Sequence, residues 1–192
     1  MKAVFEIKNY KDYLQILLEQ YSEFNSGNNI TSSRHAILCA MLAYHMREWL
    51  LKSNTDGVKT YLLKLGFIDQ FFLTNDENIK CKFNEYTNKR CPELKLIRDI
   101  CDGAKHFKLS RKNIKIAESS QRDGAFDCRF FDARHFETND LIIVDLQGKE
   151  IIFKDILAVV IQFWKKLIEE ISEVENSGDT ILNKVKYNKT NL

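Results

Sequence analysis

The residues best suited to chemistry lie in one stretch, Arg98 to His106. If this stretch is helical, Asp99, Asp102 and His106 are three and four positions apart and share a face, while Arg98 lies roughly 80° around the helix from His106. An imidazole, a guanidinium and two carboxylates would then lie near one small volume. Such a set can bind a phosphodiester and move its proton, and it is equally compatible with an ordinary polar helix edge.

Cleavage of RNA without a metal ion needs groups of these types. A base must remove the proton of the 2′-hydroxyl, and a cation must stabilise the charge that builds on the phosphorane. His106 and Arg98 match these two roles, and Asp99 or Asp102 could orient the imidazole or keep it cationic. The alternative is structural, because a histidine near a helix end commonly complements the helix dipole.

A basic segment begins next to this histidine. Between positions 105 and 115 there are five cationic side chains and no acidic one, and these are Lys105, Lys108, Arg111, Lys112 and Lys115. The net charge of the whole chain is only +2, so attraction of nucleic acid would have to come from a local patch of this kind. We expect RNA as its partner; the alternative is a solvated basic loop.

His45 and Glu48 suggest a second site. They are three positions apart and therefore adjacent on a helix, and with Asp102 and His106 from a facing helix they would form a nitrogen and oxygen ligand set for a metal. The paired Glu-x-x-His motifs of di-iron proteins are missing, and a histidine on an apolar stripe is more often a hydrogen-bonded core residue. We therefore expect no metal and no cofactor, and treat His45 and Glu48 as supporting residues.

Other common catalytic classes have no motif here. The sequence contains no glycine-rich phosphate loop, no G-x-S-x-G, no H-E-x-x-H and no dinucleotide fingerprint. His35 and His135 stand in spacings that specify neither a metal nor a nucleophile.

Helical periodicity dominates both ends of the chain and positions these residues. A first helix is expected from Tyr10 to Phe24, followed by a polar linker from Asn25. A second, capped by Ser32 or Ser33, should run to about Leu51. Its expected buried stripe is Ile37, Leu38, Met41, Leu42, His45, Trp49 and Leu50.

Shorter helices are expected at 58–65 and 75–89, before the helix that carries the candidate site. Pro92, the only proline, suits the first turn of that helix. Its expected buried face is Leu94, Ile97, Ile100, Cys101 and Ala104. Gly103 costs roughly 1 kcal/mol of helix propensity relative to alanine, which indicates either close approach of a neighbour or a weakened helix end.

The period changes to two between residues 114 and 153. Alternation around Ile116 and from Phe126 to Phe130 predicts strands, and Leu141 to Leu146 pairs with Glu150 to Phe153 as a hairpin. A last long helix should begin near Lys154 or Asp155. Its apolar positions are Ile156, Leu157, Val160, Ile161, Trp164, Leu167, Ile168 and Ile171. The predicted fold is mainly α, a helical bundle with a small antiparallel β element inserted before the last long helix.

Length and composition favour one globular domain. Its parts would be a helical portion 1–112, a β insertion 113–153, a closing helix 154–175 and a polar tail 176–192. The five cysteines are odd in number and form no C-x-x-C pair, as expected in a reducing compartment. There is no signal-peptide pattern and no apolar run long enough to span a bilayer. We expect a cytoplasmic protein that does not enter a membrane.

An arginine, a following polar residue and a downstream histidine on a late helix of a helical domain resemble the HEPN superfamily. Its members are often ribonucleases of toxin–antitoxin and antiviral defence systems. The resemblance assigns the family's catalytic roles to Arg98, Asp99 and His106, although seven residues intervene here, more than the family usually has. It covers the helical segments; the strands after Lys112 are not part of the minimal fold.

The resemblance implies an RNA-binding, metal-independent endoribonuclease that pairs as a homodimer with the two motif helices facing each other. The main alternative is a non-catalytic helical module that engages a protein partner, such as an antitoxin or a defence complex. A metal-binding helical bundle is the third interpretation.

Overall fold

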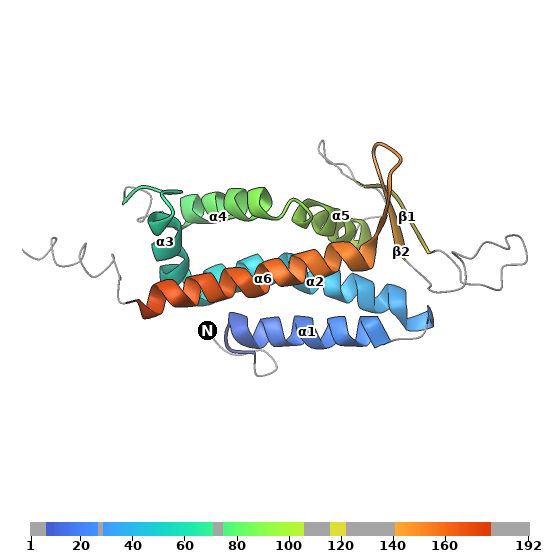
Figure 1. Ribbon diagram of the computed structural model, residues 1–192, viewed down its shortest axis with the longest axis horizontal. Helices are drawn as coiled ribbons and strands as arrows, with labels where there is room; N and C mark the ends of the chain where they lie inside the picture. Colours follow the sequence, from blue (N-terminus) through green and yellow to red (C-terminus); the bar gives the residue numbers. More distant parts are fainter. Residues whose placement is uncertain (1–6, 27–28, 71–74, 106–115, 122–140, 178–192) are drawn as a thin grey trace, which may run out of the picture. The chain divides into compact units, whose positions relative to one another are not determined.

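The computed structural model describes residues 7–26, 29–70, 75–105, 116–121 and 141–177 (Figure 1). Its elements are α1 (Tyr10–Ser26), α2 (Asn29–Ser53), α3 (Thr55–Lys64), α4 (Asp76–Arg90), α5 (Leu94–Lys105), β1 (Ile116–Gln121), β2 (Leu141–Asp145), β3 (Glu150–Ile152) and α6 (Phe153–Asn176). The predicted fold class is confirmed: the described chain is mainly helical, with a small antiparallel sheet immediately before the last long helix.

The chain forms two compact units. One contains residues 1–15, 45–92 and 162–192, and the other contains residues 16–44 and 93–161. Helices α1, α2 and α6 each contribute residues to both units. No single cut in the chain would therefore separate one unit from the other.

In the first unit, α3 and α4 begin at asparagine caps. The Asn54 side chain accepts a hydrogen bond from the Gly57 backbone N–H, and the Asn75 side chain accepts from those of Glu77 and Asn78. Caps of this kind satisfy backbone donors that have no partner inside the helix. The core of this unit contains the fully buried side chains Met46, Leu50, Leu62, Ile79, Phe83, Trp164 and Leu167.

In the second unit, the three strands form an antiparallel sheet in the order β1-β2-β3. Ile142 pairs with Ile152 and Gln121 with Leu141. The turn between β2 and β3 places Gly148 at a φ of 80°, a conformation that glycine adopts without a steric penalty. The predicted hairpin is thus confirmed, while the expected strand around residues 126–130 lies outside the described residues.

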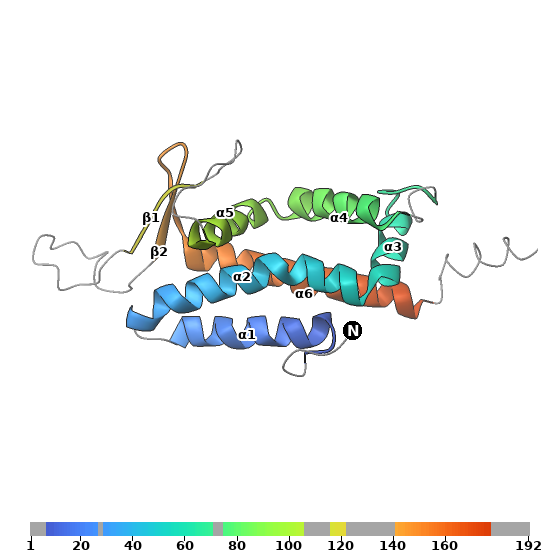
Figure 2. The ribbon, with the colours of Figure 1, turned by 180° about the vertical axis from the view of Figure 1, so that it is seen from behind.

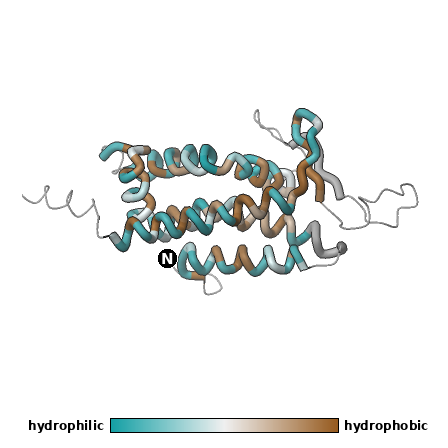
Figure 3. The backbone as a smooth tube through the Cα atoms, viewed as in Figure 1, coloured by the Kyte–Doolittle hydropathy of each residue, from teal (hydrophilic) through white to brown (hydrophobic). Residues whose placement is uncertain are grey.

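Helix α6 follows its predicted pattern. It begins at Phe153, within two residues of the expected start, and every one of its eight predicted apolar positions is buried. Hydrophobic segments recur along it in Figure 3. The apolar residues of α6 recur every 3.6 residues and charged residues lie between them. Only one face of this helix is therefore apolar enough to be buried, which is why its core residues could be predicted.

Helix α2 does not follow its predicted pattern. It begins at Asn29, so Ser32 and Ser33 lie inside it and do not cap it. The predicted stripe is wrong for Ile37 and Leu38, which are 40% and 37% exposed. The inward face of this stretch consists of small side chains, Ala36, Cys39, Ala40 and Ala43. This helix is apolar around most of its circumference, so periodicity could not identify which face is buried.

Helix α5 begins at Leu94, so Pro92 precedes the helix and does not lie in its first turn as predicted. Leu94, Ile97 and Cys101 are buried as expected, but Ala104 is exposed. A Cβ atom added at Gly103 would meet nothing within 4 Å. Close packing among the described residues therefore does not explain this glycine.

Alanine substitutions at Gly57 and Gly103 test the difference between a crowded glycine and one with free space around it. A Cβ at Gly57 would clash with the Glu175 carboxylate and would lie 2.6 Å from the capping amide of Asn54. We expect Gly57→Ala to lower the free energy of unfolding by about 1 kcal/mol, because the cap has to move. Gly103→Ala should raise it by up to about 1 kcal/mol through helix propensity. Urea unfolding of both variants is the measurement, and shifts of the same sign would contradict this account.

Candidate functional site

Helix α5 carries the first part of the predicted site. Arg98 is half-buried, and its Nε is buried with no hydrogen-bond partner among the described residues. Asp99 is only 1% exposed, and Asp102 is half-buried. A carboxylate as buried as that of Asp99 cannot touch a substrate directly, so it can act only through neighbouring groups.

The second part of the predicted site lies mostly beyond the described residues. This applies to His106 and to the cationic positions Lys108, Arg111, Lys112 and Lys115, while Lys105 is the last residue of α5. The structure therefore brings Arg98, Asp99 and Asp102 onto one helix. The approach of His106 to Arg98 stays a prediction.

His45 and Glu48 are neighbours on α2, as predicted. The Nδ1 of His45 lies 3.9 Å from an Oε2 of Glu48. His45 and Asp102 belong to different units, so their proposed convergence is not tested. Within the part of the chain that the structure describes, no three His, Cys, Asp or Glu side chains group as a metal site would require.

The second unit contains a histidine and a thiol near one glutamate. The Nδ1 of His35 lies 3.3 Å from the Oε1 of Gln20 and 3.4 Å from the Oε2 of Glu23. Cys39, one turn further along α2, is fully buried. Burial, helped by the charge of Glu23, raises the pKa of the Cys39 thiol to about 12. A thiol in this state is unreactive near neutral pH. His135 lies outside the described residues.

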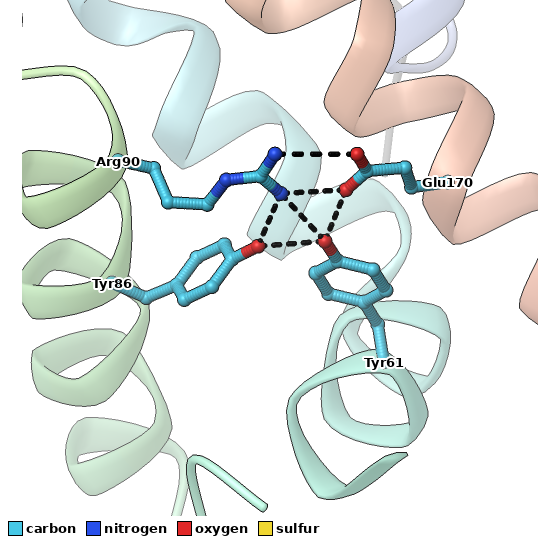
Figure 4. A network of polar contacts seen from close by, with 4 residues as sticks. All are labelled: Tyr61, Tyr86, Arg90 and Glu170. Atoms are coloured by element: carbon cyan, nitrogen blue, oxygen red, sulfur yellow. Dashed lines mark hydrogen bonds and ion pairs between the residues drawn. The ribbon is translucent and has the colours of Figure 1, made fainter. Parts of the chain in front are cut away.

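The most extensive polar cluster in the first unit was not predicted from the sequence. It joins Tyr61 of α3, Tyr86 and Arg90 of α4 and Glu170 of α6, and we call it the Tyr–Arg–Glu network (Figure 4). Arg90 Nη1 lies 2.7 Å from the Tyr86 hydroxyl, 3.1 Å from the Tyr61 hydroxyl and 2.7 Å from Glu170 Oε2, and it donates its two protons to these three acceptors, so one proton is shared. Its Nη2 donates to Glu170 Oε1 at 3.3 Å.

The protons of this network have one consistent assignment. Tyr61 donates its only hydroxyl proton to Glu170. Tyr86, whose oxygen lies 2.6 Å from that of Tyr61, must therefore be the donor in the bond between the two hydroxyls. Each hydroxyl thus donates once and accepts at least once, so neither buried tyrosine has an unsatisfied group.

The network also fixes the charges of its members. Burial and the hydrogen bonds to Glu170 and Tyr86 raise the pKa of Tyr61 above the ordinary value for tyrosine, so its phenol is neutral at neutral pH. Burial raises the pKa of Glu170, but the bonds donated by Arg90 and Tyr61 outweigh it and hold that pKa below the ordinary value. A neutral phenol and an ionised, fully bonded carboxylate are poor acid–base catalysts at neutral pH. The network therefore stabilises structure.

Sequence reasoning had only a weak signal for this network. Tyr86 and Arg90 are four residues apart and lie on one face of a helix. Tyr61 and Glu170 are 109 residues apart, and no spacing rule connects them.

The comparisons with known proteins do not identify a relative. The sequence matches no protein-family model, no curated protein and no solved structure.

Removing one hydroxyl tests the network. Tyr61→Phe deletes the bond to Glu170 and leaves the buried Tyr86 hydroxyl without its acceptor, so we expect a loss of about 1 to 3 kcal/mol of unfolding free energy. The matched control is Tyr21→Phe, since the Tyr21 hydroxyl makes no hydrogen bond among the described residues; it should change stability by less than about 0.5 kcal/mol. Equal effects of the two substitutions in urea unfolding would rule out the network as a stabilising element.

The lowered pKa of Glu170 predicts a pH dependence. The unfolded chain takes up the proton at a higher pH than the folded one, so the stabilisation by ionised Glu170 is complete above the ordinary carboxyl pKa. It is lost as pH falls through the lower folded-state pKa. The stability advantage of wild type over Glu170→Gln should therefore stay constant from neutral pH down to the ordinary carboxyl pKa of about 4.3 and shrink below it. Glu169→Gln, at the exposed neighbouring position on α6, is the control and should show no such trend in denaturant unfolding.

In the described part of the chain, none of the helices combines the length and hydrophobicity that a bilayer-spanning segment needs.

Proposed function

We propose that this chain is a HEPN-like RNA-binding protein that cleaves RNA without a metal ion, as part of a bacterial toxin or antiviral defence system. The observation that carries the proposal is the state of Arg98. A buried guanidinium nitrogen without a partner is costly, and such groups are found where a ligand completes the hydrogen bonding. Arginine matches phosphate geometry better than any other side chain.

The neighbours of Arg98 support an anionic ligand. The sequence continues from α5 into the cationic positions between 105 and 115, with no acidic residue among them. The nearby carboxylate of Asp99 is buried, so its charge does not face solvent as a free carboxylate would. A phosphate that approaches this part of α5 would meet the guanidinium of Arg98 and not the buried carboxylate of Asp99, while the half-buried Asp102 lies one turn further along the helix.

The proposed reaction is an internal transesterification. His106 takes the proton of the 2′-hydroxyl, the 2′-oxygen attacks phosphorus, and the bond from phosphorus to the 5′-oxygen breaks. The leaving oxygen takes up a proton, and the products carry a 2′,3′-cyclic phosphate and a 5′-hydroxyl. Arg98 stabilises the charge on the phosphorane, and Asp99 acts as a positioning residue.

A non-catalytic interaction module is the second candidate. The exposed apolar side chains of Ile37 and Leu38 on α2 favour it, because large apolar groups on a surface are typical of protein contacts. A protein that binds no RNA but retains this surface would fit this second function.

Cleavage of labelled single-stranded RNA by the full-length chain tests the proposal. His106→Ala and Arg98→Ala should each lower the rate by roughly 10² or more, in the presence of a chelator and without it. Lys95→Ala is the matched control, because Lys95 is an exposed cation one turn before Arg98 on the same helix and should leave the rate unchanged. Lys112→Ala should weaken binding modestly and reduce its salt dependence.

Three outcomes would contradict the proposal. They are cleavage that requires a divalent ion, cleavage that survives both the Arg98 and His106 substitutions, and products without a cyclic phosphate. Absence of any RNA binding would leave the interaction module as the better interpretation.

A further inference from the structure

Between residues 36 and 43, helix α2 presents large apolar side chains to solvent and small ones to the interior, whereas further along the helix the large side chains of Met46 and Leu50 are buried. Ile37 and Leu38 are exposed, whereas Ala36, Cys39, Ala40 and Ala43 are buried. The helix can be followed along its length in Figure 2. Soluble helices usually have the opposite arrangement, with the larger apolar groups inside, so this outward face resembles a surface that is covered in the functional state.

The outward face has the spacing of a helix-pairing seam. Arg34, Leu38, Met41, His45 and Glu48 follow one another at intervals of four, three, four and three residues. This is the heptad pattern of positions that meet a second helix. Because all five residues lie on one helix, their relative positions follow from helical geometry alone. None of them is fully buried.

The charges on this seam are arranged so that it complements itself. Met41 lies seven residues from both Arg34 and Glu48, which is about 10 Å along the helix axis in each direction. If a second α2 helix lies antiparallel, with a two-fold axis at Met41, then Arg34 faces the partner's Glu48 and Glu48 faces the partner's Arg34. Along the seam, Leu38 then lies next to the partner's His45, about 1.5 Å from level with it along the axis.

We propose that the outward face of α2 binds a second copy of this chain through antiparallel pairing of the two α2 helices. The self-complementary charges single out an identical copy, because an unrelated partner needs no such symmetry. This interface does not depend on the proposed RNA chemistry. It also differs from the arrangement that the HEPN resemblance implies, in which the helices corresponding to α5 would face each other.

The first test places a charge at the two-fold axis. The full-length chain should be a dimer in sedimentation and light scattering over a micromolar concentration series. Met41→Lys should raise the dimer dissociation constant by more than about tenfold, since two ammonium groups would meet at the axis. Leu146→Lys is the matched control: Leu146 is 64% exposed, does not lie on α2, and should leave the constant unchanged.

The second test exchanges the charges. Arg34→Glu and Glu48→Arg should each weaken the dimer, because each places like charges opposite each other twice, and the double variant should restore wild-type affinity. Circular dichroism checks that every variant is folded. A monomeric wild-type chain, a dimer that tolerates Met41→Lys, or a double variant no tighter than the single ones would overturn the proposal. Restoration by the double variant excludes misfolding as the cause of the single-variant losses.

Discussion

In the first unit, the hydrogen bonds of the Arg90 guanidinium connect three helices, α3, α4 and α6. Helix α4 is polar over most of its length and buries only Ile79, Phe83, Tyr86 and Thr87. So few apolar contacts are a weak anchor for a helix of 15 residues. Arg90 adds four hydrogen bonds that reach α3 and α6 and also satisfies two buried hydroxyls. The position of α4 in this unit is thus determined by polar geometry as much as by hydrophobic area.

The helices could be predicted from the sequence to the extent that their apolar residues form one face. Helix α6 has charged residues between its apolar positions, and all of its predicted core residues are buried. Helix α2 has alanine, cysteine and leucine around most of its circumference, so hydrophobicity alone ranked the larger side chains as core. Between residues 36 and 43 the structure shows the reverse order, with the small side chains of Ala36, Cys39, Ala40 and Ala43 buried and those of Ile37 and Leu38 exposed. Side-chain volume was the missing information.

For the candidate sites, too, some features could be predicted from the sequence and others could not. Neighbours on one helix, such as His45 with Glu48 and Arg98 with Asp102, follow directly from spacings of three and four. Contacts between helices do not, which is why Glu170 could not be linked to Tyr61. Burial could not be predicted from the sequence either: Asp99 was expected to orient the imidazole of His106 or keep it cationic, and only the structure shows that Asp99 is buried. Which polar residues of a helix face inward is decided by tertiary packing and not by their own chemistry.

The burial of Asp99 affects whether an anion could bind to Arg98 on α5. A carboxylate on the surface beside Arg98 would compete with a phosphate for the guanidinium and would repel the phosphate, and on α5 the half-buried Asp102, four residues after Arg98, is the carboxylate placed to do so. Arg98 and Asp99 are consecutive and therefore about 100° apart, so the carboxylate of Asp99 can be buried while the guanidinium stays at the boundary with solvent. Among the described residues the buried Nε of Arg98 has no hydrogen-bond partner, as is also the case for the Nδ2 of Asn54, and it is a donor that a ligand oxygen could satisfy.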